Sequence, residues 1–307
     1  MEIKKIAVIG AGMMGKMIAF VFSSQYQVSV YDIEPKDIIG DIREETKELV
    51  NKGVLSADEL ETRLSRIIFT TEMDSTAVSE ADLLIEAVFE DMALKQKTFA
   101  QLELICREDC IFCTNTSVMS PSEISRNLRN RTRFVATHFW NPAHLIPLVE
   151  VVMSDASSIE AAQTVMGALT ALGKKPVLCK KDVPGFVANR LQHALWREAF
   201  YMVQEGIADP ETVDDACKYG PGLRWPILGP MENSDLAGIQ LSYNIHDYIL
   251  KHLADNHEPS PCLREMLDRG DLGFKTGKGW QEWAPERMAA VSAGLREYLI
   301  DALTKSK

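Results

Sequence analysis

The chain has 307 residues and a formal net charge of −11, with 46% hydrophobic and 25% charged residues. Its length favours two domains over one, and its composition is that of a soluble globular protein. The acidic balance argues against a nucleic-acid-binding protein and against docking on an anionic membrane. The sequence has no signal-peptide pattern and no apolar run of membrane-spanning length, so we expect a cytoplasmic protein.

The first strong pattern lies at the N-terminus. A short apolar run at residues 6–10 is typical of a buried parallel strand. It leads into the G-x-G-x-x-G segment Gly10–Gly15 and then into an apolar helical run. A second strand at residues 28–32 ends in Asp32, about 20 residues beyond the first glycine. This order predicts a dinucleotide-binding βαβ unit.

Each part of this unit has a physical role. Gly10 permits a tight turn, Gly12 lets a pyrophosphate approach the backbone, and Gly15 allows the helix to pack closely. The helix N-terminus offers N–H groups and a partial positive charge to the phosphates. Asp32 favours NAD over NADP because it repels a 2′-phosphate, although the nearby Lys36 leaves the strictness of that preference open. A glycine-rich turn in another α/β protein is the alternative.

Six further strands alternate with helical stretches, of which the clearest cover residues 46–66 and 90–106. The expected strands are residues 67–71, 82–88, 110–114, 134–138, 148–153 and 176–179. This alternation predicts a Rossmann-like, doubly wound, mostly parallel sheet, in which ligands bind beyond the carboxyl ends of the strands. Polar residues gather at those ends, namely Glu86, Glu90, Asn115, Ser117, His138 and Asn141.

Six cysteines are present, and Cys110 and Cys113 have C-x-x-C spacing. They lack a second cysteine pair and a nearby histidine, and they lie in an apolar strand-like run. We therefore expect buried, reduced thiols rather than a metal or redox site, and we expect no bound metal. Such cysteine usage is typical of a reducing compartment.

The pattern changes near residue 182, after which no strand period is evident. Asp182 and Pro184 are typical of a helix start. The helices expected from there on cover residues 184–205, 210–218, 232–253, 261–269 and 285–303. We place an NAD-binding domain at residues 1–183 and an all-helical C-terminal domain at residues 184–307.

His138 ends an apolar strand, and the next strand carries Glu150. If the two strands are neighbours, the carboxylate can hold one ring nitrogen and fix the tautomer, as a general base requires. Oxidation of an alcohol by a nicotinamide needs such a base, because the cofactor accepts the hydride but not the proton. His144, in the intervening loop, is the competing base.

Two other polar residues have alternative roles. Ser117 can donate a hydrogen bond to a substrate oxygen or serve as a nucleophile, although no G-x-S-x-G elbow surrounds it. Asn189 lies in an apolar helical start, where it can contact a substrate or join two helices.

The chain resembles the L-3-hydroxyacyl-CoA dehydrogenase family over nearly its whole length. The resemblance is carried by residues 10–15, 86–90 with Lys95, 115–117, 138–142, 148–150, 184–190, 229–238 and 275–280. It implies a Rossmann-like domain, a helical domain that commonly dimerises, and NAD-dependent, reversible oxidation of an L-3-hydroxyacyl-CoA, such as 3-hydroxybutyryl-CoA, to the 3-ketoacyl-CoA. We therefore expect a small-molecule substrate, an acyl-CoA, and a homodimer through the C-terminal domain.

By this resemblance, His138 matches the family's base and Glu150 its carboxylate partner. Ser117, Asn141 and Asn189 match residues that hold the substrate or support the site, and Ser117 and Asn189 complete the expected catalytic set. Glu90 and Lys95 match residues near the nicotinamide half of the cofactor. The expected cofactor-binding residues are Gly10, Gly12, Met13, Met14, Gly15, Asp32, Glu90, Lys95, Asn115, Ser117 and Asn141.

The sequence also departs from the family. Val118 stands where many members have a second serine. The segment that contains Arg224 and Trp225 is similar to the corresponding segment of the lambda-crystallin/L-gulonate dehydrogenases and carnitine dehydrogenases. The enzymatic alternative is therefore a dehydrogenase of a free 3-hydroxy acid, with Arg224 binding the carboxylate. A crystallin-like structural or NAD-sensing protein is the non-enzymatic alternative. A lysine-based β-hydroxyacid dehydrogenase would leave His138 and Glu150 unexplained.

Overall fold

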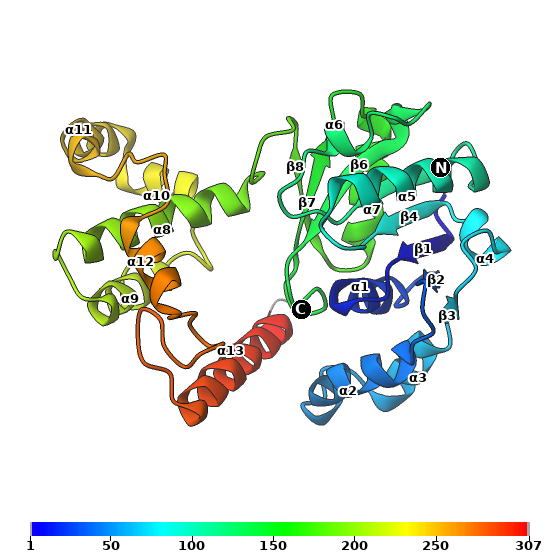
Figure 1. Cartoon of the computed structure of the whole chain (residues 1–307), viewed down its shortest axis with the longest axis horizontal. Coiled ribbons are helices and arrows are strands. Elements are labelled where there is room, and N and C mark those ends of the chain that lie inside the picture. The colour runs from blue at the N-terminus through cyan, green and yellow to red at the C-terminus, as the bar shows by residue number, and fades with distance from the viewer. Residues whose placement is uncertain (1, 306–307) are drawn as a thin grey trace. The chain divides into compact units, whose positions relative to one another are not determined.

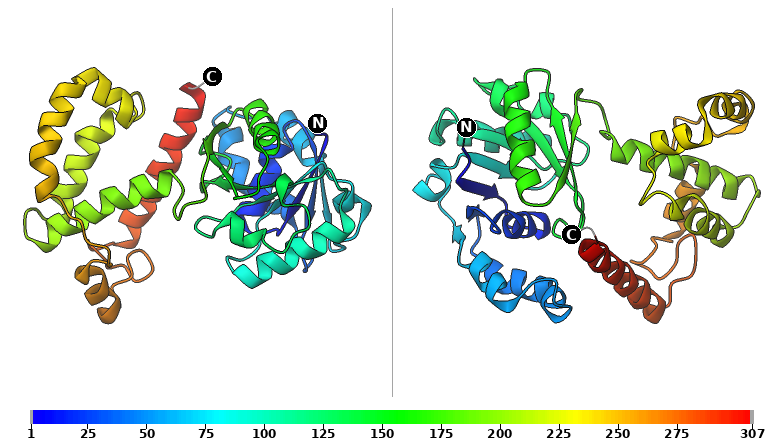
Figure 2. Two further views of the ribbon diagram at one scale, coloured as in Figure 1. Left: turned by 90° about the horizontal axis from the view of Figure 1, so that it is seen from above. Right: turned by 180° about the vertical axis from the view of Figure 1, so that it is seen from behind.

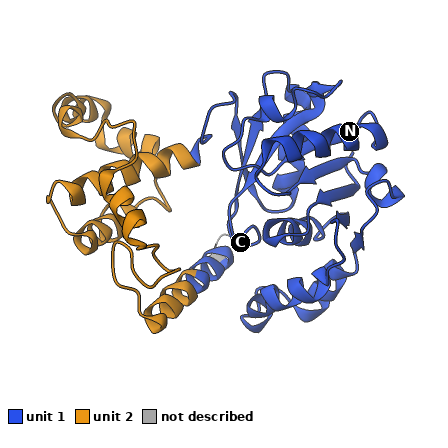
Figure 3. Cartoon of the chain, viewed as in Figure 1, with its two compact units in different colours: residues 1–188, 296–307 blue, residues 189–295 orange. Residues whose placement is uncertain are grey.

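The computed structural model describes residues 2–305 and divides the chain into two compact units (Figures 1 and 3). Unit 1 comprises Met1–Ala188 and Arg296–Lys307, and unit 2 comprises Asn189–Leu295. Among the described residues, no helix combines the length and the apolar character needed to cross a bilayer.

Unit 1 is built on one eight-stranded sheet with the order β3-β2-β1-β4-β5-β6-β7-β8. All neighbouring strands are parallel except β6 and β7, which are antiparallel. The strands are β1 (Lys5–Ile9), β2 (Gln27–Tyr31), β3 (Ile67–Thr70), β4 (Leu83–Glu86), β5 (Ile111–Thr114), β6 (Phe134–Phe139), β7 (Leu148–Met153) and β8 (Lys175–Cys179). The predicted mostly parallel, Rossmann-like sheet is confirmed.

Helices cover both faces of this sheet, which is why its strands are apolar on both sides (Figure 2). Along β1, Ile6 and Val8 belong to one core, and Ala7 and Ile9 belong to the other. The first core lies under α1 (Met13–Phe22) and α7 (Ile159–Ala171), and the second under α4 (Thr76–Ser79), α5 (Met92–Ile105) and α6 (Pro121–Ile124). A single turn of 3-10 helix, η1 (Arg131–Arg133), precedes β6.

The excursion between β2 and β3 differs from the single helix predicted at residues 46–66. It consists of two helices, α2 (Ile38–Asn51) and α3 (Ala57–Leu64). Gly53 adopts a left-handed φ of 68°, which stops the first helix. The Ser56 hydroxyl then accepts the Glu59 N–H at 3.1 Å and caps the second. The first helix begins before the predicted start because Asp37 caps it.

Unit 2 is helical, as predicted, and two of the predicted helices differ from the structure by more than two residues. The helix expected from residue 184 begins at Ala188, because Gly185 and Phe186 have φ values of 76° and 49°, outside the helical region. The helix expected over residues 232–253 is broken at Gly238, where φ is 96°. The elements are α8 (Ala188–Gln204), α9 (Pro210–Tyr219), η2 (Pro221–Leu223), α10 (Pro230–Ala237), α11 (Ile239–Ile249), η3 (Leu250–His252), α12 (Pro261–Arg269) and α13 (Pro285–Lys305).

The division between the units falls inside α13, whose last turns belong to unit 1 (Figure 3). Arg296 forms ion pairs with Glu45 at 3.3 Å and Glu48 at 2.8 Å, both on α2. Ile300 is buried in the first core of unit 1. These contacts place the end of α13 in unit 1, whereas the sequence assigned everything after residue 183 to the helical domain.

The buried Lys174 side chain holds the loop between β6 and β7 by hydrogen bonds to its backbone. Its ammonium group donates to the carbonyls of Ala143 at 2.5 Å and Ile146 at 2.8 Å. His144 in this loop is 8% exposed, and neither ring nitrogen has a hydrogen-bond partner. Burial, and then the charges of Arg296 and Lys174, lower the pKa of His144 to about 4.

This depressed pKa predicts acid sensitivity. Between pH 6.5 and pH 4 the unfolded chain protonates His144 while the folded chain does not, so stability is lost as the pH falls. The free energy of unfolding falls by about 2 kcal/mol between pH 7 and pH 4.5 for this reason. We expect urea unfolding to show that the free energy of unfolding of His144→Leu falls by about 2 kcal/mol less than that of the wild type over this interval. An equal loss in both proteins would contradict the assignment.

Candidate active site

The loop between β1 and α1 is shaped to admit a ligand against its backbone. Gly10 has a φ of 103°, and a Cβ atom there would lie 2.7 Å from the Ala87 carbonyl oxygen. A Cβ at Gly15 would lie 1.8 Å from the carbonyl oxygen of Gly10, so α1 packs directly on the turn. At Gly12, by contrast, no atom lies within 4 Å of such a Cβ. The middle glycine therefore opens onto free space in front of the helix N-terminus.

Asp32, just beyond β2, faces this loop. One carboxylate oxygen accepts the Ala11 N–H at 2.8 Å and binds the Lys36 ammonium at 2.7 Å. Burial raises the pKa of Asp32, but the hydrogen bonds from Lys36, Ala11 and Glu34 outweigh burial and hold it below its usual value. Asp32 is therefore ionised near neutral pH, and it fixes the glycine-rich turn as well as presenting a charge at the strand end.

Apolar side chains frame the same edge of the sheet. Met13, Ile33, Phe89 and Val118 are all exposed, and each follows the carboxyl end of a different strand, β1, β2, β4 or β5. Flat rings of a dinucleotide need apolar contacts, and its pyrophosphate needs an uncapped helix N-terminus. α1 begins without a side-chain cap and with no acidic residue in its first turn. The residues present thus fit a dinucleotide.

A buried ion pair lies between β4 and α5. The Lys95 ammonium, 1% exposed, binds Glu86 at 2.7 Å and Glu90 at 3.2 Å. Glu86 is fully buried and also accepts the Thr114 hydroxyl at 2.7 Å and the Val88 N–H at 2.8 Å. Burial raises the pKa of Glu86 against the opposing effect of Lys95. Because the pair and its remaining lone pairs are satisfied, it can hold the strand end rigidly.

Glu90 extends this network to the loop after β5. Its carboxylate accepts the Thr116 hydroxyl and, at 3.0 Å, the Ser117 N–H. Burial raises the pKa of Glu90, but the Thr116 hydrogen bond and Lys95 outweigh burial and keep it low. Asn115 is anchored on the other side, where its side-chain oxygen accepts the Phe139 N–H of β6 at 3.0 Å. Its NH₂ group is thus the end of the side chain that can donate to a ligand.

The centre of the site is the contact between His138 and Glu150. These residues are register partners in the antiparallel β6–β7 pair, and the His138 Nδ1 lies 2.8 Å from Glu150 Oε2. His138 is 5% exposed and Glu150 is fully buried. The contact predicted from the sequence is therefore present, because an antiparallel partner puts both side chains on the same face of the sheet.

Glu150 is held by other donors as well. Its second oxygen accepts the N–H groups of Val187 and Ala188, each at 2.9 Å, and Trp140 Nε1 lies 3.4 Å from the first oxygen. Burial raises the pKa of Glu150, but the hydrogen bonds from His138, Ala188 and Val187 outweigh burial and lower it. The carboxylate is thus ionised near neutral pH, so the proton of a neutral imidazole sits on Nδ1. His138 Nε2 then carries a lone pair.

Two aromatic rings flank the imidazole. The ring of Trp140 lies 5.7 Å from that of His138, and the ring of Phe186 lies 5.8 Å from it, centroid to centroid. Phe186 is buried and has a left-handed φ, which is rare for a bulky residue. The conformation turns the chain so that the next two N–H groups meet Glu150. Strain of this kind is typical of functional sites.

The remaining predicted residues are placed as follows. Met14 packs against the first core of unit 1, Ser117 and Asn141 are exposed in their loops, and Asn189 opens unit 2 directly after Ala188. His144, the competing base, contacts no carboxylate among those described. Sequence reasoning missed Glu86 as the partner of Lys95 and missed the N–H groups of Val187 and Ala188. The spacing of Glu86 and Lys95 around a strand end was the available signal for the first.

No group of metal-ligating residues is found within residues 2–305. All six cysteines are unpaired, and Cys110 and Cys113 are buried, as predicted. Burial raises the pKa of the Cys113 thiol well above its usual range. The neighbouring Cys106 thiol, and then burial, raise the pKa of Cys110 as well. Because a protonated thiol is a poor metal ligand and nucleophile, the sulfur atoms of Cys110 and Cys113 are structural.

Comparison with protein families gives two matches that together cover most of the chain. Residues 5–183 match the NAD-binding domain of 3-hydroxyacyl-CoA dehydrogenase, and residues 185–283 match the C-terminal domain of the same enzyme. The last helix, α13, lies beyond the matched residues.

Individual relatives differ in their substrates. A 5-formyl-3-hydroxy-2-methylpyridine 4-carboxylate 5-dehydrogenase of Mesorhizobium japonicum is 31% identical over 97% of this chain and 96% of its own. A probable 3-hydroxybutyryl-CoA dehydrogenase of Bacillus subtilis is 34% identical over 92% and 98%. The crystal structure of a dehydrogenase of the pyridine type, described as an NAD⁺-dependent dismutase, has a TM-score of 0.89 at 29% identity and covers 99% of both chains.

The geometry around Asp32 predicts its effect on cofactor binding. Asp32→Ala removes a charged acceptor and leaves Lys36 without its partner, so we expect the Kd for NADH to rise by about tenfold and that for NADPH to change less. Fluorescence titration of both nucleotides measures this. Asp37→Ala is the matched control, because Asp37 is a nearby acid that instead caps α2, where it accepts the Gly40 N–H at 2.9 Å. Undiminished NADH affinity in Asp32→Ala would rule out this role.

Proposed function

We propose that this chain, which belongs to the 3-hydroxyacyl-CoA dehydrogenase family, oxidises an L-3-hydroxyacyl-CoA reversibly to the 3-ketoacyl-CoA. It is an oxidoreductase whose cofactor is NAD. The observation that supports the reaction is the buried His138–Glu150 contact at the carboxyl end of β6. Oxidation of a secondary alcohol requires a base with a free lone pair, and His138 Nε2 provides one.

NAD, when bound, supplies the hydride acceptor. His138 Nε2 takes the proton of the substrate hydroxyl as the carbon loses its hydride. The imidazolium that forms is stabilised by Glu150, which stays ionised because four groups donate to it or lie within 3.4 Å. In the reverse direction, protonated His138 returns the proton to the carbonyl oxygen. Ser117, Asn141 and Asn189 are assigned to orienting the substrate.

A second candidate substrate is favoured by the comparisons. The dehydrogenase with 99% mutual coverage acts, by its name, on a pyridine carboxylate rather than a thioester. This candidate is a small free hydroxy acid, for which the exposed Arg224 beside Trp225 offers a guanidinium. The proton chemistry at His138 would be the same, so the two candidates differ only in what holds the rest of the substrate.

A substrate panel tests the proposal directly. We expect NADH oxidation with acetoacetyl-CoA to exceed that with free 3-keto acids and with aromatic aldehyde carboxylates. His138→Ala should lower kcat by about 10³-fold on the best substrate while NADH still binds.

His144→Leu is the control, because it replaces a second buried histidine of the same region that has no acid partner. It should keep most of the activity at pH 7.5. If a free acid is turned over faster than acetoacetyl-CoA, the thioester is not the substrate and the second candidate is favoured. Near-normal turnover in His138→Ala would refute the mechanism for both.

We also propose that the chain forms a homodimer through unit 2. None of the described residues in α8 to α12 is buried. Large apolar side chains are exposed there, among them Ile227 at 81% and Met231 at 76%. A soluble monomer rarely exposes so many, and a second copy of the same face can cover them by two-fold symmetry.

Sedimentation analysis should give about twice the 34.3 kDa mass of one chain. Placing charges in the exposed surface by Ile227→Glu with Met231→Glu should shift the protein to the monomer. Ile68→Glu is the matched control, because Ile68 is an exposed apolar residue of β3 in unit 1. A dimer that survives the double substitution would place the interface elsewhere.

A further inference from the structure

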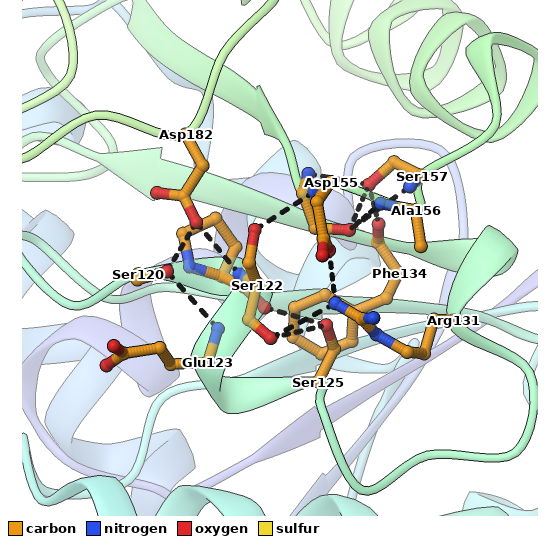
Figure 4. A network of polar contacts seen from close by, with 12 residues as sticks. Ser120, Ser122, Glu123, Ser125, Arg131, Phe134, Asp155, Ala156, Ser157 and Asp182 are labelled. Atoms are coloured by element: carbon orange, nitrogen blue, oxygen red, sulfur yellow. Dashed lines mark hydrogen bonds and ion pairs between the residues drawn. The ribbon is translucent and has the colours of Figure 1, made fainter.

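Asp182 lies in the connection between β8 and α8, within unit 1. One of its carboxylate oxygens accepts two hydrogen bonds from the start of α6, the Ser120 hydroxyl and the Ser122 N–H at 3.0 Å (Figure 4). These residues lie about 60 positions earlier in the chain, at the far end of the loop that begins after β5. The carboxylate thus joins two segments that have no covalent connection nearby.

The first of these segments, residues 115–120, carries Ser117. Glu90 holds its beginning through the Thr116 hydroxyl and the Ser117 N–H. Asp182 holds its end through Ser120. Between these two anchors the loop has no secondary structure of its own, and Ser117 is exposed. The two carboxylates therefore hold this loop on either side of Ser117.

The second segment, residues 182–188, supports the general base. It begins at Asp182, passes through the two left-handed residues Gly185 and Phe186, and ends in the N–H groups that Glu150 accepts. The ring of Phe186 contacts the imidazole of His138 on the way. Asp182 thus lies five residues before the first of the two N–H groups that hold Glu150.

We propose that Asp182 is a positioning residue that locks the Ser117 loop to the segment supporting the His138–Glu150 pair. It acts through the two segments that it joins. The inference rests on the proposed function, in which Ser117 orients the substrate and His138 takes its proton, so that the distance between these two residues affects the rate. A misplacement of about 1 Å between reacting groups can cost roughly 100-fold in rate.

Asp182 is not needed for the fold of α6. The Ser120 hydroxyl already caps that helix by accepting the Glu123 N–H at 3.2 Å. Ser122 is held independently, since its hydroxyl accepts the Asp155 N–H at 2.9 Å and its carbonyl accepts from Arg131 at 3.2 Å. In Figure 4, Asp155 and Arg131 approach Ser122 from the side opposite Asp182. The Asp182 contact is the part of the network that reaches the β8–α8 connection.

The test compares four full-length proteins, with kcat measured at saturating NAD and the KM for NAD measured in a separate titration. Asp182→Ala should lower kcat by about 10- to 100-fold and leave the KM for NAD within about twofold, because the glycine-rich loop is untouched. Asp182→Asn keeps an oxygen acceptor and should recover to within about threefold of the wild type. Asp155→Ala removes a carboxylate of the same network, the one paired with Arg131, and should change kcat by less than about twofold.

A kcat near the wild-type value in Asp182→Ala, or no recovery in Asp182→Asn, would overturn the inference. If Asp182→Ala does not fold, Ser120→Ala removes one of the two hydrogen bonds and should lower kcat by about three- to tenfold. An unchanged kcat in that variant counts equally against it.

Amide hydrogen exchange separates this inference from the proposed function. In the NAD-saturated protein, Asp182→Ala should accelerate exchange in residues 115–125 and in residues 182–190, whereas Asp155→Ala should leave residues 182–190 unchanged. This result does not depend on the substrate. If the panel finds no turnover but exchange rises in both segments, the proposed function fails and the lock stands. If turnover is found but exchange does not rise, the lock fails alone.

Discussion

The site depends on one buried carboxylate, that of Glu150, held against the imidazole of His138. A fully buried charge is costly unless donors surround it, and Glu150 meets this requirement with the imidazole and two backbone N–H groups. These donors come from β6 and from Val187 and Ala188, where α8 begins. The strand register, the antiparallel pairing and the unusual backbone at Phe186 are therefore all constrained by the same group.

The cofactor side of unit 1 follows a similar principle. Parallel strands end at one edge, where their terminal residues need partners because the sheet no longer supplies them. Glu86 pairs with Lys95 and accepts a hydrogen bond from Thr114. Glu90 accepts the N–H of Ser117 in the loop after β5. Acidic side chains thus order three neighbouring loops: Asp32 holds the loop after β1, Glu86 the loop after β4 and Glu90 the loop after β5. Although the net charge of the chain is −11, an anionic dinucleotide can bind because hydrogen-bond donors at the helix N-terminus face its phosphates.

The sequence predicted those features that local patterns encode. The spacing of the glycines predicted the turn at Gly10, and the alternation of short apolar runs with helical stretches predicted the sheet. A histidine at the end of one strand and an acid in the next predicted the contact between His138 and Glu150. The sequence did not predict the late start of α8, because Gly185 and Phe186 leave the helical region to satisfy Glu150 far away in the chain. The roles of Asp182 and Glu86 likewise depend on partners that no short window contains.

A double-substitution cycle on kcat tests the central claim most directly. Glu150→Gln alone should slow turnover by about 100-fold, because the imidazolium loses its counter-charge. In a His138→Ala background the same change should cost less than about threefold, since no imidazolium forms there. Equal penalties in both backgrounds would show that Glu150 acts independently of His138, and would contradict the account.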